Sequence, residues 1–168
     1  MKTFIAGTAN ALVLAAMAAV GFYQIDEASA QQRINTIDMD DKYCLQQNIY
    51  FEARNQSTLG QASVAWVTLN RVESERYPND ICGVVWQNKQ FSWTHDGKKD
   101  EPGTSFLEQQ AWEKAGVVTD VVLMEWARAR QSPVEDATMY HATWMDKAPY
   151  WAASYNEITT IEDHIFYN

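Results

Sequence analysis

One glutamate in this sequence, Glu52, occupies a position where a carboxyl group can act as an acid. Apolar residues recur at helical spacing over residues 40–56, and Glu52 follows Ile49 by three positions and Leu45 by seven. A helix therefore places Glu52 on its apolar face. Burial there disfavours the carboxylate and raises its pKa. A carboxylic acid that keeps its proton near neutral pH can donate that proton to a leaving oxygen.

A second interpretation of Glu52 treats it as an ordinary residue at a helix end, solvated or paired with Arg54. In a regular helix, Arg54 is only two residues further on and points in another direction. Helical periodicity alone does not decide between the two interpretations.

The composition of the chain limits its class. Its 168 residues suit one domain, and a hydrophobic content of 46% with 12% aromatic residues supplies enough material for a core, which excludes a disordered chain. The formal net charge is −9. A protein this acidic has no general attraction for nucleic acids or for anionic membrane surfaces.

The first 30 residues predict an export signal. Lys2 precedes an almost wholly apolar stretch from Phe4 to Tyr23, and Ala28-Ser29-Ala30 fits the small-x-small pattern of a signal peptidase site. We expect cleavage after Ala30. The alternative is an uncleaved signal-anchor that contacts the inner membrane and is later released. Residues 31–40 are polar and are expected to form a tether, followed by the catalytic domain over residues 41–168.

Export changes the interpretation of the two cysteines, Cys44 and Cys82. In an oxidising compartment, an isolated pair of this kind most simply forms a disulfide. The competing interpretation makes Cys44 a nucleophile that works with His141. No local motif supports it, and no spacing of Cys and His residues indicates a metal site.

The remaining pattern predicts an α+β domain dominated by helices. Thr58 and Gln61 have the spacing of a capping box that opens a second helix. The predicted elements are helices over residues 41–56, 58–73, 80–85 and 105–130, the last with a break near Gly116, an extended piece over 91–93, and strands over 139–142 and 158–167.

Several segments resemble the SleB-type cell wall hydrolase family, which includes the spore cortex-lytic enzymes. The similar segments are Asn48-Ile49-Tyr50-Phe51-Glu52-Ala53-Arg54, residues 60–72, Tyr77-Pro78, Cys82-Gly83-Val84-Val85, Gln90-Phe91-Ser92-Trp93, residues 137–142 and His164-Ile165-Phe166-Tyr167. The resemblance covers most of the chain after residue 40. One departure follows Arg54, where Asn55-Gln56 replaces the usual Gly-Glu of the family.

The resemblance implies a lysozyme-like fold and cleavage of the peptidoglycan glycan strand, with Glu52 as the catalytic acid. It also implies lytic transglycosylase chemistry, in which one glutamate serves as acid and then as base. A hydrolytic muramidase is the alternative and usually needs a second carboxylate. Asp96 and Asp100, in the segment after Trp93, are the candidates for that group, although a turn beside Gly97 explains both of them without catalysis.

Aromatic and polar residues of the matching segments are candidates for sugar binding, because flat rings stack on the apolar faces of sugars. The predicted substrate-binding residues are Phe91, Ser92, Trp93, Tyr140, His141 and Tyr167, with Trp93 and Tyr140 expected in the cleft wall. Core packing is the alternative for each aromatic residue. His164, in an apolar strand, is expected to be structural. A zinc amidase would need the histidines to converge, which their spacing does not support, and no metal or organic cofactor is indicated.

The biological setting expected from these features is that of an exported phage endolysin, a monomer that acts on peptidoglycan in the periplasm or cell wall to lyse the host cell. A host wall-remodelling enzyme fits the same residues. A glycan-binding module without catalysis, in which Glu52 is merely buried, is a third possibility that the number of aromatic residues does not exclude.

Overall fold

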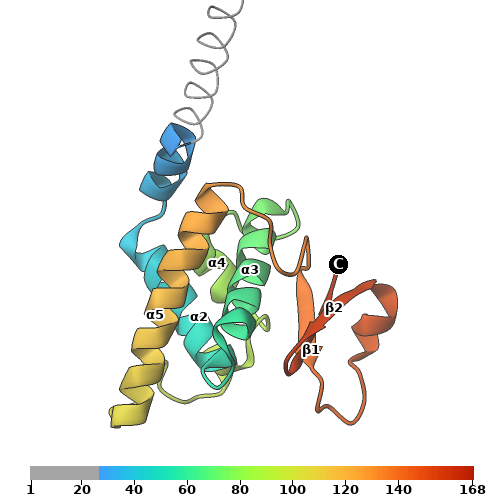
Figure 1. Cartoon of the computed structure of the whole chain (residues 1–168). Coiled ribbons are helices and arrows are strands. Elements are labelled where there is room, and N and C mark those ends of the chain that lie inside the picture. Colours follow the sequence, from blue (N-terminus) through green and yellow to red (C-terminus); the bar gives the residue numbers. More distant parts are fainter. Residues whose placement is uncertain (1–26) are drawn as a thin grey trace, which may run out of the picture.

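The computed structural model describes residues 27–168, so the apolar stretch from Phe4 to Tyr23 lies outside the described residues (Figure 1). Residues 27–36 are helical where the sequence predicted the end of a signal and the start of a tether, and Ala30 is buried within this helix. The guanidinium of Arg33 lies 5.7 Å from the ring centre of Trp126. The cleavage site after Ala30 stays a prediction.

Helix α2 (Met39–Ala53) and helix α3 (Thr58–Glu73) carry most of the core. Asp38 caps α2 by accepting a hydrogen bond from the Asp41 backbone N–H at 2.7 Å. The predicted capping box of α3 is wrong, because Ser57 is the N-cap residue. The Gln61 side chain is fully buried instead and donates to the Ala53 carbonyl at 3.1 Å. It thereby satisfies a backbone group at the end of α2.

Helix α4 (Ile81–Val85) begins after Asp80, as the sequence predicted, and the 3-10 helix η1 (Ser92–His95) takes the place of the predicted extended piece. Helix α5 (Phe106–Ala127) starts with a capping box of Ser105 and Glu108. It continues through Gly116 without the predicted break. A Cβ at Gly116 would lie 2.9 Å from the Gln46 side chain, so this glycine serves the close approach of α5 to α2.

Three antiparallel strands form the sheet, in the order β1 (Met139–Ala142), β3 (His164–Tyr167) and β2 (Glu157–Ile161). The sequence predicted β2 and β3 as one strand, but the chain reverses between them at Glu162, which has a positive φ of 50°. The connection from β1 to β2 contains the 3-10 helix η2 (Tyr150–Ser154). Met139 pairs with Tyr167, which fixes the register of β1 against β3.

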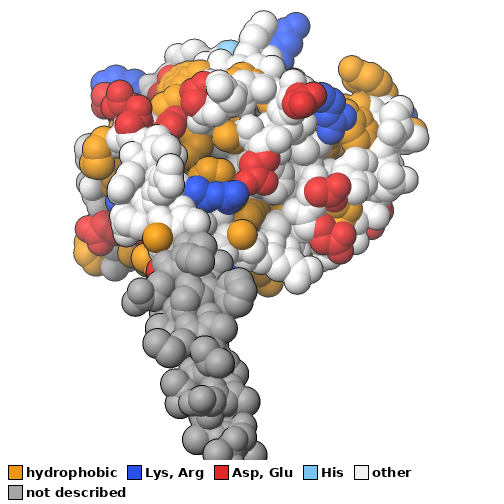
Figure 2. All heavy atoms as spheres, turned by 90° about the horizontal axis from the view of Figure 1, so that it is seen from above, with side chains coloured by type: hydrophobic (Ala, Val, Ile, Leu, Met, Phe, Trp, Pro, Cys, Tyr) orange, Lys and Arg blue, Asp and Glu red, His pale blue; other side chains and the backbone are white. Residues whose placement is uncertain are grey.

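Helices α2, α3, α4 and α5 pack into one body, and the sheet stands beside α3 (Figure 1). The core side chains that are completely buried include Leu45 and Ile49 of α2, Val64 and Leu69 of α3, and Phe166 of β3. Acidic groups are spread over the face seen in Figure 2, with Lys and Arg side chains between them, rather than gathered into one patch. Within residues 27–168, no helix has the length and apolarity needed to cross a bilayer.

A disulfide joins Cys44 of α2 to Cys82 of α4, across a sequence separation of 38 residues. The chain has only two cysteines, and both are in this bond. The alternative in which Cys44 is a nucleophile is therefore wrong, since that chemistry requires a free thiol.

We predict that the double variant Cys44→Ser and Cys82→Ser loses about 4 kcal/mol in free energy of unfolding, because the disulfide restricts the unfolded chain. Denaturant unfolding of the two proteins measures this difference. Wild-type protein under reducing conditions should match the double variant. Equal stability of the oxidised and reduced wild type would contradict the prediction.

Candidate active site

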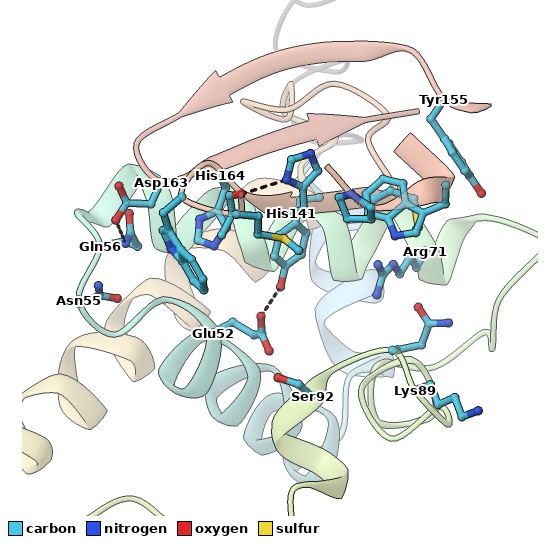
Figure 3. A pocket seen from close by; sticks show the side chains of 18 of the residues that line it. Glu52, Asn55, Gln56, Arg71, Lys89, Ser92, His141, Tyr155, Asp163 and His164 are labelled. Carbon is cyan, nitrogen blue, oxygen red and sulfur yellow. Dashed lines mark hydrogen bonds between the residues drawn. The ribbon is translucent and has the colours of Figure 1, made fainter. Parts of the chain in front are cut away.

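A cleft of about 790 Å³ lies between the helical body and the sheet. Glu52 and Ser92 lie near its middle in Figure 3. Asn55, Gln56 and Asp163 lie toward one end of the cleft, and Arg71, Lys89 and Tyr155 lie toward the other. The cleft therefore extends to both sides of Glu52, which suits a long substrate that passes across it.

Glu52 lies in the last turn of α2, directly before the end of the helix at Ala53. Its Oε2 atom accepts a hydrogen bond of 2.9 Å from the hydroxyl of Tyr140 in β1. Burial raises the pKa of Glu52, and this effect is the largest of those that act on it. The Tyr140 hydroxyl and the charge of Arg71 lower the pKa again, but the net direction is upward. Glu52 is thus held as an acid whose proton can be given away.

Tyr140 is a donor that keeps its own proton. Burial of its hydroxyl raises its pKa well above the ordinary value, and the neighbouring charge of Glu52 adds to this effect. The hydroxyl is consequently available to donate to the carboxyl of Glu52 at all moderate pH values. This contact fixes the position of the Glu52 side chain relative to the sheet.

Arg71 of α3 is the second charged group at the base of the cleft, and only 3% of it is exposed. Its Nε donates to the Thr138 carbonyl at 2.7 Å, and its guanidinium lies 5.1 Å from the ring centre of Phe91. Its buried Nη1 has no acceptor among residues 27–168, and burial lowers its pKa. Its positive charge favours the carboxylate form of Glu52, although burial and the Tyr140 hydrogen bond affect the pKa of Glu52 more.

Sequence reasoning missed Arg71, although a signal for it exists. Arg71 follows Val67 by four residues and Val64 by seven, so it lies on the buried face of α3. This is the same criterion that singled out Glu52 on α2. A buried charge on an apolar face is uncommon and indicates a functional role.

The predicted substrate-binding residues fall into two groups. Ser92, Tyr140 and His141 line the cleft. Phe91, Trp93 and Tyr167 are buried and do not line it, which corrects their predicted position. The physical reason is that each one packs against core groups. Phe91 packs against the guanidinium of Arg71, and Tyr167 stacks on the ring of His141. Trp93 stacks on the ring of Phe51 and donates a hydrogen bond to the Asn48 amide oxygen.

His141 is held by hydrogen bonds on both ring nitrogens. Its Nδ1 lies 3.0 Å from the Ala142 carbonyl, and its Nε2 lies 3.0 Å from the Tyr167 hydroxyl. A carbonyl only accepts, so Nδ1 carries the proton and a neutral ring accepts the Tyr167 O–H at Nε2. His164 also lines the cleft, and burial lowers its pKa. Both histidines shape the cleft wall from the sheet.

The two aspartates proposed as second carboxylates lie outside the cleft lining. Asp96 is exposed and forms an ion pair of 3.2 Å with Lys98, as a turn residue does. The Asp100 backbone carbonyl accepts a hydrogen bond from Gln47. Asp163 does line the cleft, but its Oδ2 accepts a hydrogen bond of 2.9 Å from Gln56. Figure 3 shows this pair at one end of the cleft, away from Glu52.

We predict that Arg71→Met raises the pKa of Glu52 further above its ordinary value, because the positive charge that favours the carboxylate is lost. A carbon-13 NMR titration of the glutamate carboxyl groups measures this change. Arg76→Met is the matched control, because Arg76 also contacts Thr138 but is exposed and does not line the cleft. An unchanged Glu52 titration in folded Arg71→Met would contradict the prediction.

Residues 55–167 match the family described as Cell Wall Hydrolase. The match begins after Glu52, so it does not by itself assign a role to that residue. Among curated proteins, the spore cortex-lytic enzyme of Bacillus cereus is 36% identical over 64 residues, which are 38% of this chain and 25% of that protein. The enzyme of the same name from Halalkalibacterium halodurans is 33% identical over 78 residues, 45% of this chain and 24% of that protein.

The chain thus spans about a quarter of the length of these curated relatives. Two solved structures are similar over 80% of this chain, each with 27% identity. The first is the catalytic domain of the Bacillus cereus SleB protein, with a TM-score of 0.59 and 94% of that chain covered. The second is the catalytic domain of the germination-specific lytic transglycosylase SleB from Bacillus anthracis, with a TM-score of 0.60 and 98% of that chain covered. These similarities confirm the predicted lysozyme-like α+β fold. Since the family match extends over most of the described residues and the fold agrees with it, the chain belongs to the cell wall hydrolase family.

Proposed function

We propose that this protein cleaves the glycan strand of peptidoglycan between N-acetylmuramic acid and N-acetylglucosamine, with Glu52 as acid and then base. The observation that carries the proposal is the Glu52 carboxyl group, whose pKa is raised by burial and which Tyr140 holds in the middle of an open cleft. The similarity to a lytic transglycosylase catalytic domain supports the same reaction class.

In the first step, protonated Glu52 donates its proton to the glycosidic oxygen, and the bond from that oxygen to C1 of the muramic acid breaks. Negative charge develops on Glu52 while positive charge develops on the sugar. The Tyr140 hydroxyl and the Arg71 charge both favour the carboxylate form of Glu52, so they stabilise it as it loses its proton.

In the second step, the C6 hydroxyl of the same sugar attacks C1 and gives its proton to the Glu52 carboxylate. A 1,6-anhydro ring forms, and Glu52 regains the proton that it donated. The attacking group belongs to the substrate, so it has a high effective concentration and needs no second carboxylate to orient it. One acid at the middle of the cleft is sufficient for this reaction.

Hydrolysis by water is the second candidate reaction, and the observation that favours it is the position of Asp163 in the cleft lining. Asp163 is the carboxylate, besides Glu52, that lines the cleft within the described residues. A hydrolase uses such a partner to activate water or to stabilise the sugar cation. The hydrogen bond from Gln56 turns the Asp163 carboxylate to the end of the cleft, which favours the intramolecular reaction.

The setting in which we place this activity is the bacterial cell wall, with the protein exported by its N-terminal segment and acting as an endolysin. A host wall-remodelling role would use the same chemistry. In either setting the protein is proposed to act as a monomer.

We predict that Glu52→Gln abolishes the clearing of purified peptidoglycan and leaves glycan binding largely intact, because the amide keeps the shape but does not transfer the proton. Turbidity and a sedimentation binding assay measure the two properties. Glu75→Gln is the control, because Glu75 is exposed and does not line the cleft. Equal clearing by Glu52→Gln and wild type would refute the role of Glu52, and binding without clearing by the wild type would favour a non-catalytic module.

We predict that activity declines as pH rises through the raised pKa of Glu52, because the first step needs the protonated carboxyl group. The rate of clearing as a function of pH measures this limb. Activity that rises through the same range would show that an ionised group starts the reaction.

We predict that the products end in 1,6-anhydromuramic acid and take up no oxygen from heavy-oxygen water. Mass spectrometry of the released muropeptides reports both the bond that is cleaved and the mechanism. Labelled reducing-end muramic acid as the main product would establish hydrolysis and make Asp163 the next residue to substitute.

A further inference from the structure

The connection between β1 and β2 carries four aromatic residues that the proposed mechanism does not use. They are Trp144, Tyr150, Trp151 and Tyr155. Trp144, Trp151 and Tyr155 line the cleft, and Tyr150 does not. Trp151 packs against the rings of His141, Tyr155 and Tyr167, which explains its presence. Trp144 has no ring partner among residues 27–168 and is 77% exposed.

The backbone on both sides of Trp144 is fixed to the sheet. The Thr143 N–H donates to the Asp163 carbonyl at 2.8 Å, and the Met145 N–H donates to the Ala142 carbonyl at 3.4 Å. Trp144 therefore projects from an anchored turn at the end of β1, next to the turn between β2 and β3. A large exposed ring on a fixed backbone binds a partner at a small entropic cost.

Polar groups lie beside this ring in the same cleft. Asn55 is exposed, and its side chain has no hydrogen-bond partner among the described residues. Asp163 accepts from Gln56 through Oδ2. An apolar ring in the same cleft as amide and carboxylate groups is a combination that recognises a sugar, because a pyranose has an apolar face and a rim of hydroxyl groups.

This group of residues lies away from the chemistry. Figure 3 shows Asn55, Gln56 and Asp163 toward one end of the cleft, with Glu52 nearer its middle. The hydrogen bond from Thr143 to Asp163 places the Trp144 turn at that same end. A sugar ring bound there belongs to the strand that crosses the cleft, but it is not the ring at which the bond breaks.

We propose that Trp144, Asn55 and Asp163 form a distal sugar subsite, which binds one ring of the glycan strand by stacking on the indole and by hydrogen bonds to the amide and carboxylate groups. The proposal rests on the proposed function, since it takes the glycan strand as the substrate. In this proposal, the β1–β2 connection recognises the length of the strand, while Glu52 performs the cleavage.

The test measures binding in the full-length Glu52→Gln protein, which does not consume its ligand. The probe is a series of peptide-free peptidoglycan glycan strands separated by length, with affinity measured by calorimetry. Trp144→Ala is compared with Tyr150→Ala, because Tyr150 is 94% exposed on the same connection but does not line the cleft. Both side chains are on the surface, so equal melting temperatures of the variants and the parent verify folding.

We expect Trp144→Ala to bind long strands about three- to tenfold more weakly than the parent and to bind the shortest strands as well as the parent does. We expect Tyr150→Ala to match the parent for strands of every length. Unchanged affinity of Trp144→Ala for long strands would overturn the subsite. An equal loss in both variants, or an equal loss for short and long strands, would also overturn it. Absence of any glycan binding by the parent, together with no cleavage by the wild type, would instead reject the proposed function on which the subsite depends.

Discussion

The hydrogen bond between the Tyr140 hydroxyl and the Glu52 carboxyl joins two residues that are 88 positions apart in the chain. It connects the last turn of α2 to β1, so the helical body and the sheet must be placed correctly for it to form. Several further contacts support this placement. Gln61 holds the end of α2 through the Ala53 carbonyl, and Arg71 holds the start of β1 through the Thr138 carbonyl. Each of these donors is buried, so loss of either would leave a costly unpaired group.

The acidity of Glu52 is a balance between two opposing effects. Burial alone would keep the carboxyl group protonated and would also make it reluctant to release its proton. Tyr140 and Arg71 act in the opposite direction, because each favours the carboxylate. The proposed role, in which Glu52 donates a proton and then takes one back, is served by opposing effects of this kind. Among residues 27–168, Nη1 of Arg71 has no acceptor, which is consistent with this role, since an ion pair elsewhere would reduce its effect on Glu52.

Helical periodicity placed Glu52 on the apolar face of its helix, and the resemblance to the hydrolase family decided its interpretation as an acid. The same reasoning, applied to α3, would have identified Arg71. It did not place Phe91, Trp93 and Tyr167, because the same aromatic side chain suits a cleft wall and a core, and only the packing of distant segments decides between them. The hairpin between β2 and β3 was missed because Glu162 adopts a positive φ without a glycine to signal the turn. Trp144 was missed because its turn is held by a hydrogen bond from Thr143 to the carbonyl of Asp163, which is distant in sequence.

In the arrangement that we propose, chemistry and recognition are separated along the chain. Glu52 and Arg71 lie on α2 and α3, which carry completely buried core side chains, so the positions of these helices tolerate little change. The connection over residues 143–156 lies on the surface, and its exposed side chains make few core contacts. If the distal subsite is as proposed, substitutions there alter what the cleft binds without moving Glu52, because the hydrogen bond between Tyr140 and Glu52 does not pass through this connection. Besides the backbone hydrogen bonds at Thr143 and Met145, Trp151 joins this connection to the sheet by packing on His141 and Tyr167, so its loss would disturb the sheet side of the cleft.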